Sequence, residues 1–345
     1  MKKILVVNVN WVGDVIFSSP IFKALKQAYP EATISCMAPL RVKEVLECIE
    51  CLDEIIICDE GNVHNGIFAK IKLILELRKK KFDAAFLLHR SLTRALFVYF
   101  AGIPNRIGYD TKKRGAFLTH KVDWIEVNDV HRRDYYLNVI ESFGVKVNER
   151  RTVLVPKNEV TQSVMTILRN NCVEDNDRLI IVNCGGNWDL KRWPKENFVE
   201  LIEKLIGEYK QKGIKVIISG APTDIVLVES IVEQLKEKPI VLVGKTTLIQ
   251  VISLMSLAEL LISADSGPLH IANSVNTDTI AIFGPTRSEI TGPKGKGKAV
   301  ILQKDIECNR QPCYKLDCDD NVCMKAITAD DVFKIAVKII SDKGK

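Results

Sequence analysis

The chain has 345 residues, of which 47% are hydrophobic and 27% are charged. This mix is typical of a soluble globular protein, so it excludes wholesale disorder, and the length predicts about two domains rather than one small module. Lys and Arg number 49 against 43 Asp and Glu, a formal net charge of +6. That excess indicates anionic partners but is far below that of a histone-like protein.

The beginning of the chain lacks the pattern of an export signal. Only residues 4–7 form an apolar run before Asn8 and Asn10 interrupt it, and this run is too short for a signal-peptide core. The longest apolar stretch, 251–264, contains Glu259 and is shorter than the roughly 20 apolar residues of a membrane span. We therefore expect a cytoplasmic protein without a transmembrane segment.

Short β-branched segments alternate with longer amphipathic segments in the first part of the chain. This order predicts a parallel sheet with helices on both faces, forming a first domain over residues 1–157. The predicted strands are 4–9, 33–37, 54–58 and 84–88, and the predicted helices are 18–29, 41–48 and 67–80.

A second alternating series predicts a second α/β domain over residues 158–327. Its predicted strands are 179–184, 215–219, 240–243, 260–263 and 279–283, and its predicted helices are 195–212, 223–236, 248–255 and 269–274. A final amphipathic helix lies within 328–345, and the sequence does not indicate which domain it packs on. Two doubly wound domains facing each other would form a cleft at the carboxyl ends of their strands, where ligands bind in such sheets.

The loop after the first predicted strand contains a candidate base. Gly13 is expected to permit a tight turn and the close approach of a ligand. The next residue, Asp14, would then lie at the rim of the cleft, where a carboxylate can act as a general base toward a hydroxyl. The alternative is that Asp14 caps the following helix.

The loop after the first strand of the second domain, 183–194, contains two glycines followed by two cations. Backbone N–H groups around Gly186, together with Lys191 and Arg192, predict an anion site at the start of a helix. The alternative is a solvated basic turn whose two tryptophans pack on the edge of the domain.

A third polar loop follows the predicted strand 260–263. The N–H groups of Ser266 and Gly267 can meet a phosphate, and Asp265 can accept hydrogen bonds from sugar hydroxyls. His270 follows one turn later and is either part of this site or a packed core histidine. A fourth loop, 284–287, offers one more glycine turn and a hydroxyl.

Other ligand motifs fail on inspection. No Gly-x-Gly-x-x-Gly follows a strand, and the Gly-Lys-Thr at 244–246 has Pro239 where a P-loop needs its first glycine. The Asp-x-Asp triplets at 175–177 and 317–319 are interpreted as turns. We therefore expect no metal ion in the active site.

Cysteines recur every fifth residue near the end of the chain. This spacing puts successive residues on different faces of a helix, so a looped segment is expected. A structural Zn²⁺, local disulfides and free thiols are the three alternatives. The four residues are Cys308, Cys313, Cys318 and Cys323. The other six cysteines are expected to be reduced.

Basic clusters at 78–81, 112–114 and 131–133 form, in one interpretation, a positive face for an anionic acceptor held at a membrane. Such runs are also typical of solvated helix ends. Nucleic acid is not the expected partner, because aromatic residues are not interleaved with these cations.

Three of these loops together carry a family resemblance. The Trp-Val-Gly-Asp at 11–14, the Lys-Arg-Trp-Pro at 191–194 and the Asp-Ser-Gly-Pro-Leu-His at 265–270 resemble the bacterial ADP-heptose:lipopolysaccharide heptosyltransferases. The resemblance covers essentially the whole chain. The first of these motifs and the Met-Ala-Pro at 37–39 look more like heptosyltransferase II than heptosyltransferase I.

The resemblance implies a GT-B fold, two Rossmann-like domains with the acceptor in the first and the donor in the second. It implies an inverting transferase that moves heptose from ADP-heptose to the lipopolysaccharide inner core and needs no cofactor. By the same resemblance Asp14 matches the general base, Lys191 faces the donor diphosphate, and 265–270 is the donor loop. Asn187 replaces the hydroxyl residue that the family often has at the phosphates. The expected location is the cytoplasm, with peripheral contact at the inner membrane.

Rival functions differ in the residues they need. A two-lobed solute-binding protein would normally be exported, and a non-catalytic nucleotide-sugar-binding protein would need neither Asp14 nor Lys191. A transferase of another nucleotide sugar is compatible with all of these motifs.

Overall fold

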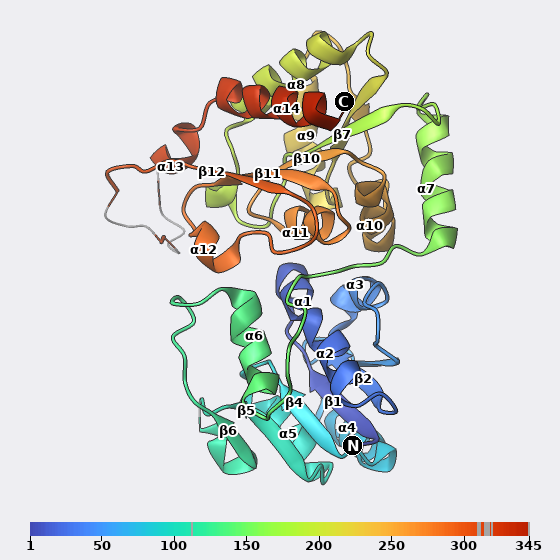
Figure 1. Ribbon diagram of the computed structural model, residues 1–345, viewed down its shortest axis with the longest axis vertical. Coiled ribbons are helices and arrows are strands. Elements are labelled where there is room, and N and C mark those ends of the chain that lie inside the picture. The colour runs from blue at the N-terminus through green and yellow to red at the C-terminus, as the bar shows by residue number, and fades with distance from the viewer. Residues whose placement is uncertain (112, 309–311, 314–317, 319, 344–345) are drawn as a thin grey trace. The chain divides into compact units, whose positions relative to one another are not determined.

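The computed structural model describes the chain except residues 112, 309–311, 314–317, 319 and 344–345. The chain divides into two compact units, Met1–Val155 and Pro156–Lys345 (Figure 1). Each unit contains a six-stranded sheet in which the strand pairs are parallel. The predicted α/β class is therefore confirmed in both halves of the chain.

The sheet of the first unit has the order β3-β2-β1-β4-β5-β6. The strand order reverses between β1 and β4, which is where open α/β sheets bind ligands. The strands are β1 (Lys3–Val7), β2 (Thr33–Ala38), β3 (Glu54–Ile57), β4 (Ala84–Leu87), β5 (Asn105–Tyr109) and β6 (His120–Val122).

The helices of the first unit are α1 (Val12–Ser18), α2 (Pro20–Ala28), α3 (Lys43–Leu46), α4 (Ile67–Lys80), α5 (Leu92–Phe100) and α6 (Arg132–Glu141), with 3₁₀ turns η1 (Leu40–Val42) and η2 (Arg114–Phe117). The single helix predicted over 18–29 is wrong at its start. Helical structure begins at Val12 and is interrupted at Ser19, because Pro20 lacks the N–H that would continue the ladder.

The sheet of the second unit has the order β12-β11-β10-β7-β8-β9. Its strands are β7 (Arg178–Asn183), β8 (Ile214–Ser219), β9 (Ile240–Val241), β10 (Leu260–Ala264), β11 (Asp278–Phe283) and β12 (Ala299–Gln303). The sequence pattern does not predict β12, an edge strand that is only partly buried. The first strand in sequence, β7, lies between β10 and β8, so its carboxyl end is again at the reversal point.

The helices of the second unit are α7 (Asn158–Asn170), α8 (Lys195–Tyr209), α9 (Ile225–Val232), α10 (Leu248–Ser256), α11 (Gly267–Ser274), α12 (Ser288–Thr291), α13 (Val322–Lys325) and α14 (Ala329–Lys343), with 3₁₀ turns η3 (Asp189–Lys191) and η4 (Pro222–Asp224). The final helix, α14, packs on α8 in this unit.

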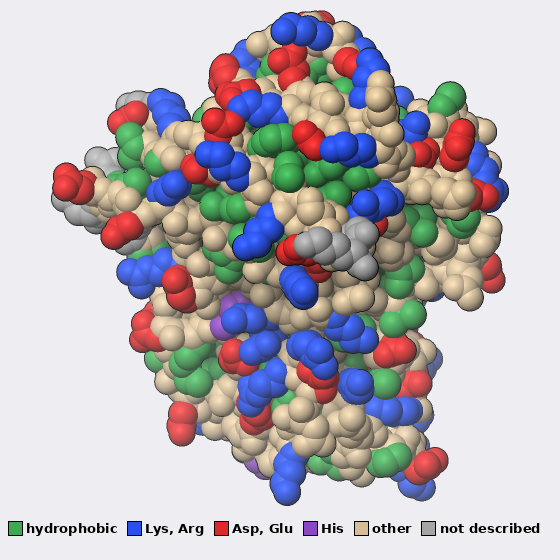
Figure 2. Space-filling view, turned by 45° about the horizontal axis from the view of Figure 1, so that its top comes forward, with side chains coloured by type: hydrophobic (Ala, Val, Ile, Leu, Met, Phe, Trp, Pro, Cys, Tyr) green, Lys and Arg blue, Asp and Glu red, His purple; other side chains and the backbone are tan. Residues whose placement is uncertain are grey.

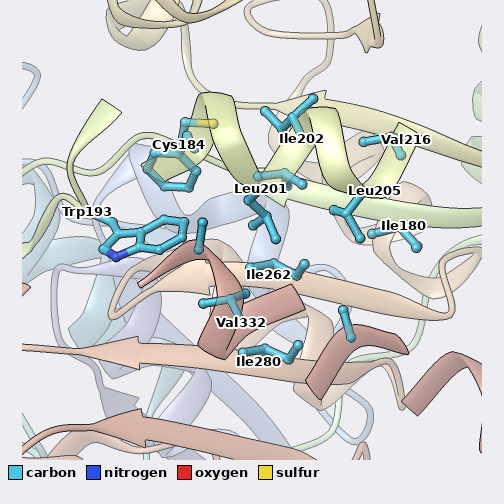
Figure 3. Packing of buried hydrophobic residues seen from close by; sticks show 14 of the residues in the cluster. Ile180, Cys184, Trp193, Leu201, Ile202, Leu205, Val216, Ile262, Ile280 and Val332 are labelled. Atoms are coloured by element: carbon cyan, nitrogen blue, oxygen red, sulfur yellow. The ribbon is translucent and has the colours of Figure 1, made fainter. Parts of the chain in front are cut away.

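One hydrophobic cluster joins α8, α9 and α14 to the sheet of the second unit (Figure 3). Trp193 lies in this cluster and is 2% exposed. Its indole Nε1 donates a hydrogen bond to the carbonyl oxygen of Ile327 at 2.8 Å, which ties the loop after β7 to the approach to α14. The alternative that both tryptophans pack on the domain edge is therefore wrong for Trp193.

Candidate active site

Asp14 lies in the first turn of α1, where the helix dipole favours a carboxylate. The phenol of Tyr136 on α6 donates a hydrogen bond to Asp14 Oδ1 at 2.9 Å. Burial raises the pKa of Tyr136 well above its ordinary value, and the nearby charge of Asp14 raises it further. Tyr136 is thus a neutral, fixed donor that holds the carboxylate in one orientation.

Two expectations for this loop are corrected. Trp11 is the N-cap residue of α1, so Asp14 is not the cap of the helix that follows. Gly13 lies inside the first turn of α1 rather than in a tight turn, because the helix begins earlier than the sequence pattern indicates.

A cavity of about 470 Å³ opens at the carboxyl edge of the first sheet. It lies next to the Asp14 loop, because Asn10, two residues after β1 and just before α1, lines its wall. The other lining residues follow β2, β3 and β4: Pro39, Arg41, Cys58, Asp59, Glu60, Gly61, Asn62, His89, Ser91 and Arg94. The wall is therefore mostly polar and carries charges of both signs.

Arg94 organises this cavity. It is 2% exposed, and its guanidinium donates hydrogen bonds to the carbonyl oxygen of Asn8 at 2.6 Å and to Asn10 Oδ1 at 2.7 Å. Its third bond is an ion pair with Glu60 at 3.0 Å. The amide of Asn10 in turn contacts His89 Nε2 at 3.1 Å. Arg94 thereby links residues that follow three strands, β1, β3 and β4, in the wall of the cavity.

The second unit brings two predicted residues into direct contact. Lys191 Nζ lies 2.6 Å from Asp265 Oδ2. The contact forms because β7 and β10 are paired neighbours, so that the loops after their carboxyl ends meet. The two loops that the sequence predicts as an anion loop and a donor loop therefore meet at this ion pair.

The carboxylate of Asp265 has further partners besides Lys191. Thr286 and Thr291 donate to its Oδ2 at 2.8 and 3.3 Å, and His270 Nε2 lies 3.6 Å from its Oδ1. Burial acts to raise the pKa of Asp265, but the hydrogen bond from His270 and the charge of Lys191 outweigh it and hold this pKa well below its usual range. Asp265 is therefore an anion at every physiological pH, and the buried His270 lies against it.

The remaining predicted residues surround this pair. Ser266 is the N-cap of α11 and makes no side-chain cap hydrogen bond, and Gly267 is the first residue of the helix. Gly186 accepts a hydrogen bond from Arg192 Nε at 2.9 Å through its carbonyl oxygen. Asn187 in the same loop is exposed.

Position 185, just before Gly186, requires a glycine for a structural reason. A Cβ at this position would lie 2.1 Å from Asp224 Oδ2, so only glycine allows this approach. Asp224 is 5% exposed and is anchored by the backbone N–H of Ala221 at 2.9 Å. The glycine therefore lets the loop after β7 pack against the end of β8.

Known proteins match the whole chain. The model of glycosyltransferase family 9 (heptosyltransferase) matches residues 70–320. The chain belongs to glycosyltransferase family 9. A curated relative, lipopolysaccharide heptosyltransferase 2 of Escherichia coli K12, is 28% identical over 317 residues, 87% of each chain.

Two solved structures of this family share the fold. The family 9 glycosyltransferase of Veillonella parvula has a TM-score of 0.86 at 26% identity over 99% of this chain and 97% of its own. The ADP-heptose lipopolysaccharide heptosyltransferase II of E. coli has a TM-score of 0.82 at 23% identity over 100% of both chains. This heptosyltransferase family member is thus a glycosyltransferase with a GT-B fold, as the motifs at 11–14, 191–194 and 265–270 predict.

In the structure of this heptosyltransferase family member no disulfide joins the four clustered cysteines or the other six. The N–H of Cys313 donates to the carbonyl oxygen of Pro285 at 2.8 Å, and Cys323 lies in α13. Among the described residues, no group of three or more His, Cys, Asp or Glu side chains is placed to hold a metal ion. The residues between the first three cysteines lie mostly outside the described ranges.

This arrangement gives a testable result. Protein denatured without a reductant should take up alkylating agent at all ten cysteines, because the structure has ten free thiols. Intact mass spectrometry counts the added groups. A count that reaches ten only after reduction would restore the disulfide alternative, and about one Zn²⁺ per chain in elemental analysis of the native protein would support the metal alternative.

Along the part of the chain that the structure covers, no helix combines the length and the apolar character that a membrane span requires. Figure 2 shows that Lys and Arg side chains lie among Asp and Glu side chains on the face it presents.

Proposed function

We propose that this chain transfers heptose from ADP-heptose to the inner core of lipopolysaccharide, with inversion at the anomeric carbon. Similarity to lipopolysaccharide heptosyltransferase 2 over 87% of the chain supports the reaction. One observation carries the mechanism. The Asp14 carboxylate lies in the helix that follows β1 and accepts a hydrogen bond from the neutral phenol of Tyr136.

Asp14 is the proposed general base, and the first unit is the proposed acceptor domain. The acceptor hydroxyl gives its proton to Asp14 while its oxygen bonds to the anomeric carbon, and the bond from that carbon to the diphosphate oxygen breaks. One displacement inverts the centre. The polar cavity lined by Asn10 is the proposed binding site of the acceptor sugars. Amide, imidazole and carboxylate groups in its wall can form hydrogen bonds with sugar hydroxyls.

The second unit is the proposed donor domain, and Lys191 is the proposed cation at the leaving diphosphate. An ammonium group has three N–H donors, so pairing with Asp265 leaves others for phosphate oxygens. The side chain of Lys191 is 22% exposed, which allows this contact. Gly186, Asn187, Ser266 and Gly267 are proposed to approach the diphosphate, while Asp265 and His270 complete the donor site.

A donor screen tests the proposal. The purified protein is incubated with an inner-core acceptor and, separately, with ADP-heptose, ADP-glucose and uridine diphosphate sugars, and release of the nucleotide is followed. We expect acceptor-dependent release of ADP from ADP-heptose, abolished in the Asp14→Asn control. Preference for another nucleotide sugar would support the alternative transferase, and tight binding without turnover would support a non-catalytic binding protein.

Chelators should not stop the reaction. A fixed cation such as the Lys191 ammonium group, together with backbone N–H groups such as those at the start of α11, can offset the charge of a leaving diphosphate without a metal ion. We therefore expect transfer at an unchanged rate in excess EDTA, measured with the same nucleotide-release assay. Complete loss of activity that Mg²⁺ restores would instead place a metal ion on the diphosphate.

The acceptor is part of a lipid, so the proposed reaction brings the first unit to a membrane surface. We propose that the enzyme works in the cytoplasm as a peripheral protein at the inner membrane.

A further inference from the structure

Helix α4 of the first unit has two apolar faces. Leu73 and Leu77 are buried in the core between the helix and the sheet. Four other large apolar side chains of the same helix point to solvent, with exposed fractions of 66% for Ile67, 85% for Phe68, 45% for Ile71 and 51% for Leu75. The core needs only one such face, so burial in the core does not account for the second.

The four exposed side chains form one continuous surface. At about 100° per residue they fall within an arc of roughly 100°, on the side of the helix away from Leu73 and Leu77. We call Ile67, Phe68, Ile71 and Leu75 the outer face of α4. Scattered exposed apolar residues need no explanation, but a stripe of four on one helix indicates a contact surface.

Cations accompany this face. The sequence of α4, Ile67–Lys80, contains five Lys and Arg residues against the single acid Glu76. Lys72 and Lys79 lie along one border of the outer face, Arg78 lies at its carboxyl-terminal end, and all three are exposed. Lys80 is paired with Glu54 on the neighbouring strand, so it belongs to the fold.

We propose that the outer face of α4 lies flat on the surface of an anionic lipid bilayer. An interfacial helix sinks its apolar side chains to the boundary of headgroups and acyl chains while Lys and Arg reach the lipid phosphates. Fourteen residues give a helix about 21 Å long, suited to lying on a bilayer rather than crossing it. The inference rests on the proposed function only for its purpose, which is to bring the acceptor domain to a lipid-borne acceptor.

A second copy of the chain fits this face less well. Two outer faces packed together would bring the cations of one copy, Lys72, Arg78 and Lys79, against those of the other, and like charges repel. Four side chains on one short helix also offer much less than the 1,200–2,000 Å² or so that a stable protein interface buries. An anionic bilayer can bury the apolar side chains of the outer face and also attract the cations beside it.

Vesicle co-sedimentation of the full chain, without donor or acceptor, tests the proposal. We expect binding to vesicles that contain phosphatidylglycerol, weaker binding to phosphatidylcholine alone, and weakening by salt. Phe68→Ser combined with Leu75→Ser should lower the partition coefficient by at least about tenfold. Both positions are exposed, so an unchanged circular dichroism spectrum and melting temperature are expected.

Val226→Ser is the matched control, because Val226 is 78% exposed on α9 of the second unit and has no place in the outer face. Equal binding of the double variant and the wild type would overturn the proposal. So would a dimer in analytical ultracentrifugation that the double variant turns into a monomer, since the face would then join two copies.

Turnover rates on a soluble and on a vesicle-borne acceptor distinguish this proposal from the proposed function. The double variant should keep wild-type kcat on a delipidated, water-soluble acceptor and lose rate on the same acceptor carried in vesicles. Outer-face-dependent vesicle binding without any heptose transfer would overturn the proposed function alone. Transfer to both acceptors at wild-type rates would overturn the role of α4 and leave the proposed function intact.

Discussion

Asp14→Asn is expected to lower kcat by about 10² to 10⁴, the usual contribution of a positioned general base. The amide is nearly isosteric with the carboxylate, and its oxygen can still accept the hydrogen bond from Tyr136, so the local geometry should persist. The affinity for ADP should not change, because Asp14 belongs to the first unit and the proposed donor residues belong to the second. Steady-state kinetics and calorimetric titration with ADP measure the two quantities. Near-normal turnover would reject Asp14 as the base.

Tyr136→Phe separates the orientation of the base from its chemistry. The hydrogen bond from the phenol favours the charged form of Asp14, so its removal should raise the pKa of that carboxylate. The acidic limb of kcat/KM should therefore move to higher pH, with a smaller loss of rate on the alkaline plateau than in Asp14→Asn. A uniform fall in rate with an unmoved pH profile would show that Tyr136 serves packing alone.

The fold and the site loops were predictable because they depend on local patterns. Alternating strands and helices predict two parallel sheets, and the carboxyl ends of strands locate the loops of Asp14, Lys191 and Asp265. Their partners depend on strand order, which a single sequence does not contain. Lys191 meets Asp265 because β10 lies beside β7, although 74 residues separate them along the chain.

Residues that act through distant partners could not be predicted from the sequence. Tyr136 reaches Asp14 across 122 residues, and Arg94 is anchored by Asn8, Asn10 and Glu60 from the ends of other strands. Neither lies in a motif. The outer face of α4 escaped for a different reason, since periodicity identifies an amphipathic helix but does not show that a second apolar face stays exposed.

Asp265→Asn is expected to weaken donor binding at least about tenfold and to lower the free energy of unfolding by about 3 kcal/mol, because breaking a buried ion pair leaves its partner uncompensated. That partner is Lys191, whose side chain remains 22% exposed, so the lower end of the usual range applies.

Lys191→Met should weaken ADP binding and slow transfer together, since the cation acts on both the bound donor and the transition state. Lys195→Met is the control, because Lys195 is an exposed cation at the start of α8 that does not belong to the proposed donor site.

The stability effect of Asp265→Asn should depend on pH in one direction. The folded-state pKa of Asp265 is depressed, so its ionised form stabilises the fold fully above the unfolded-state pKa of about 3.9. That contribution falls as the pH drops below this value toward the folded-state pKa. Denaturant unfolding of the wild type and Asp265→Asn should therefore show a constant difference between pH 5 and 8 or so, shrinking below about pH 4. A difference that does not change down to pH 3 or so would mean that the variant loses a neutral hydrogen bond rather than the charge that holds Lys191 in place.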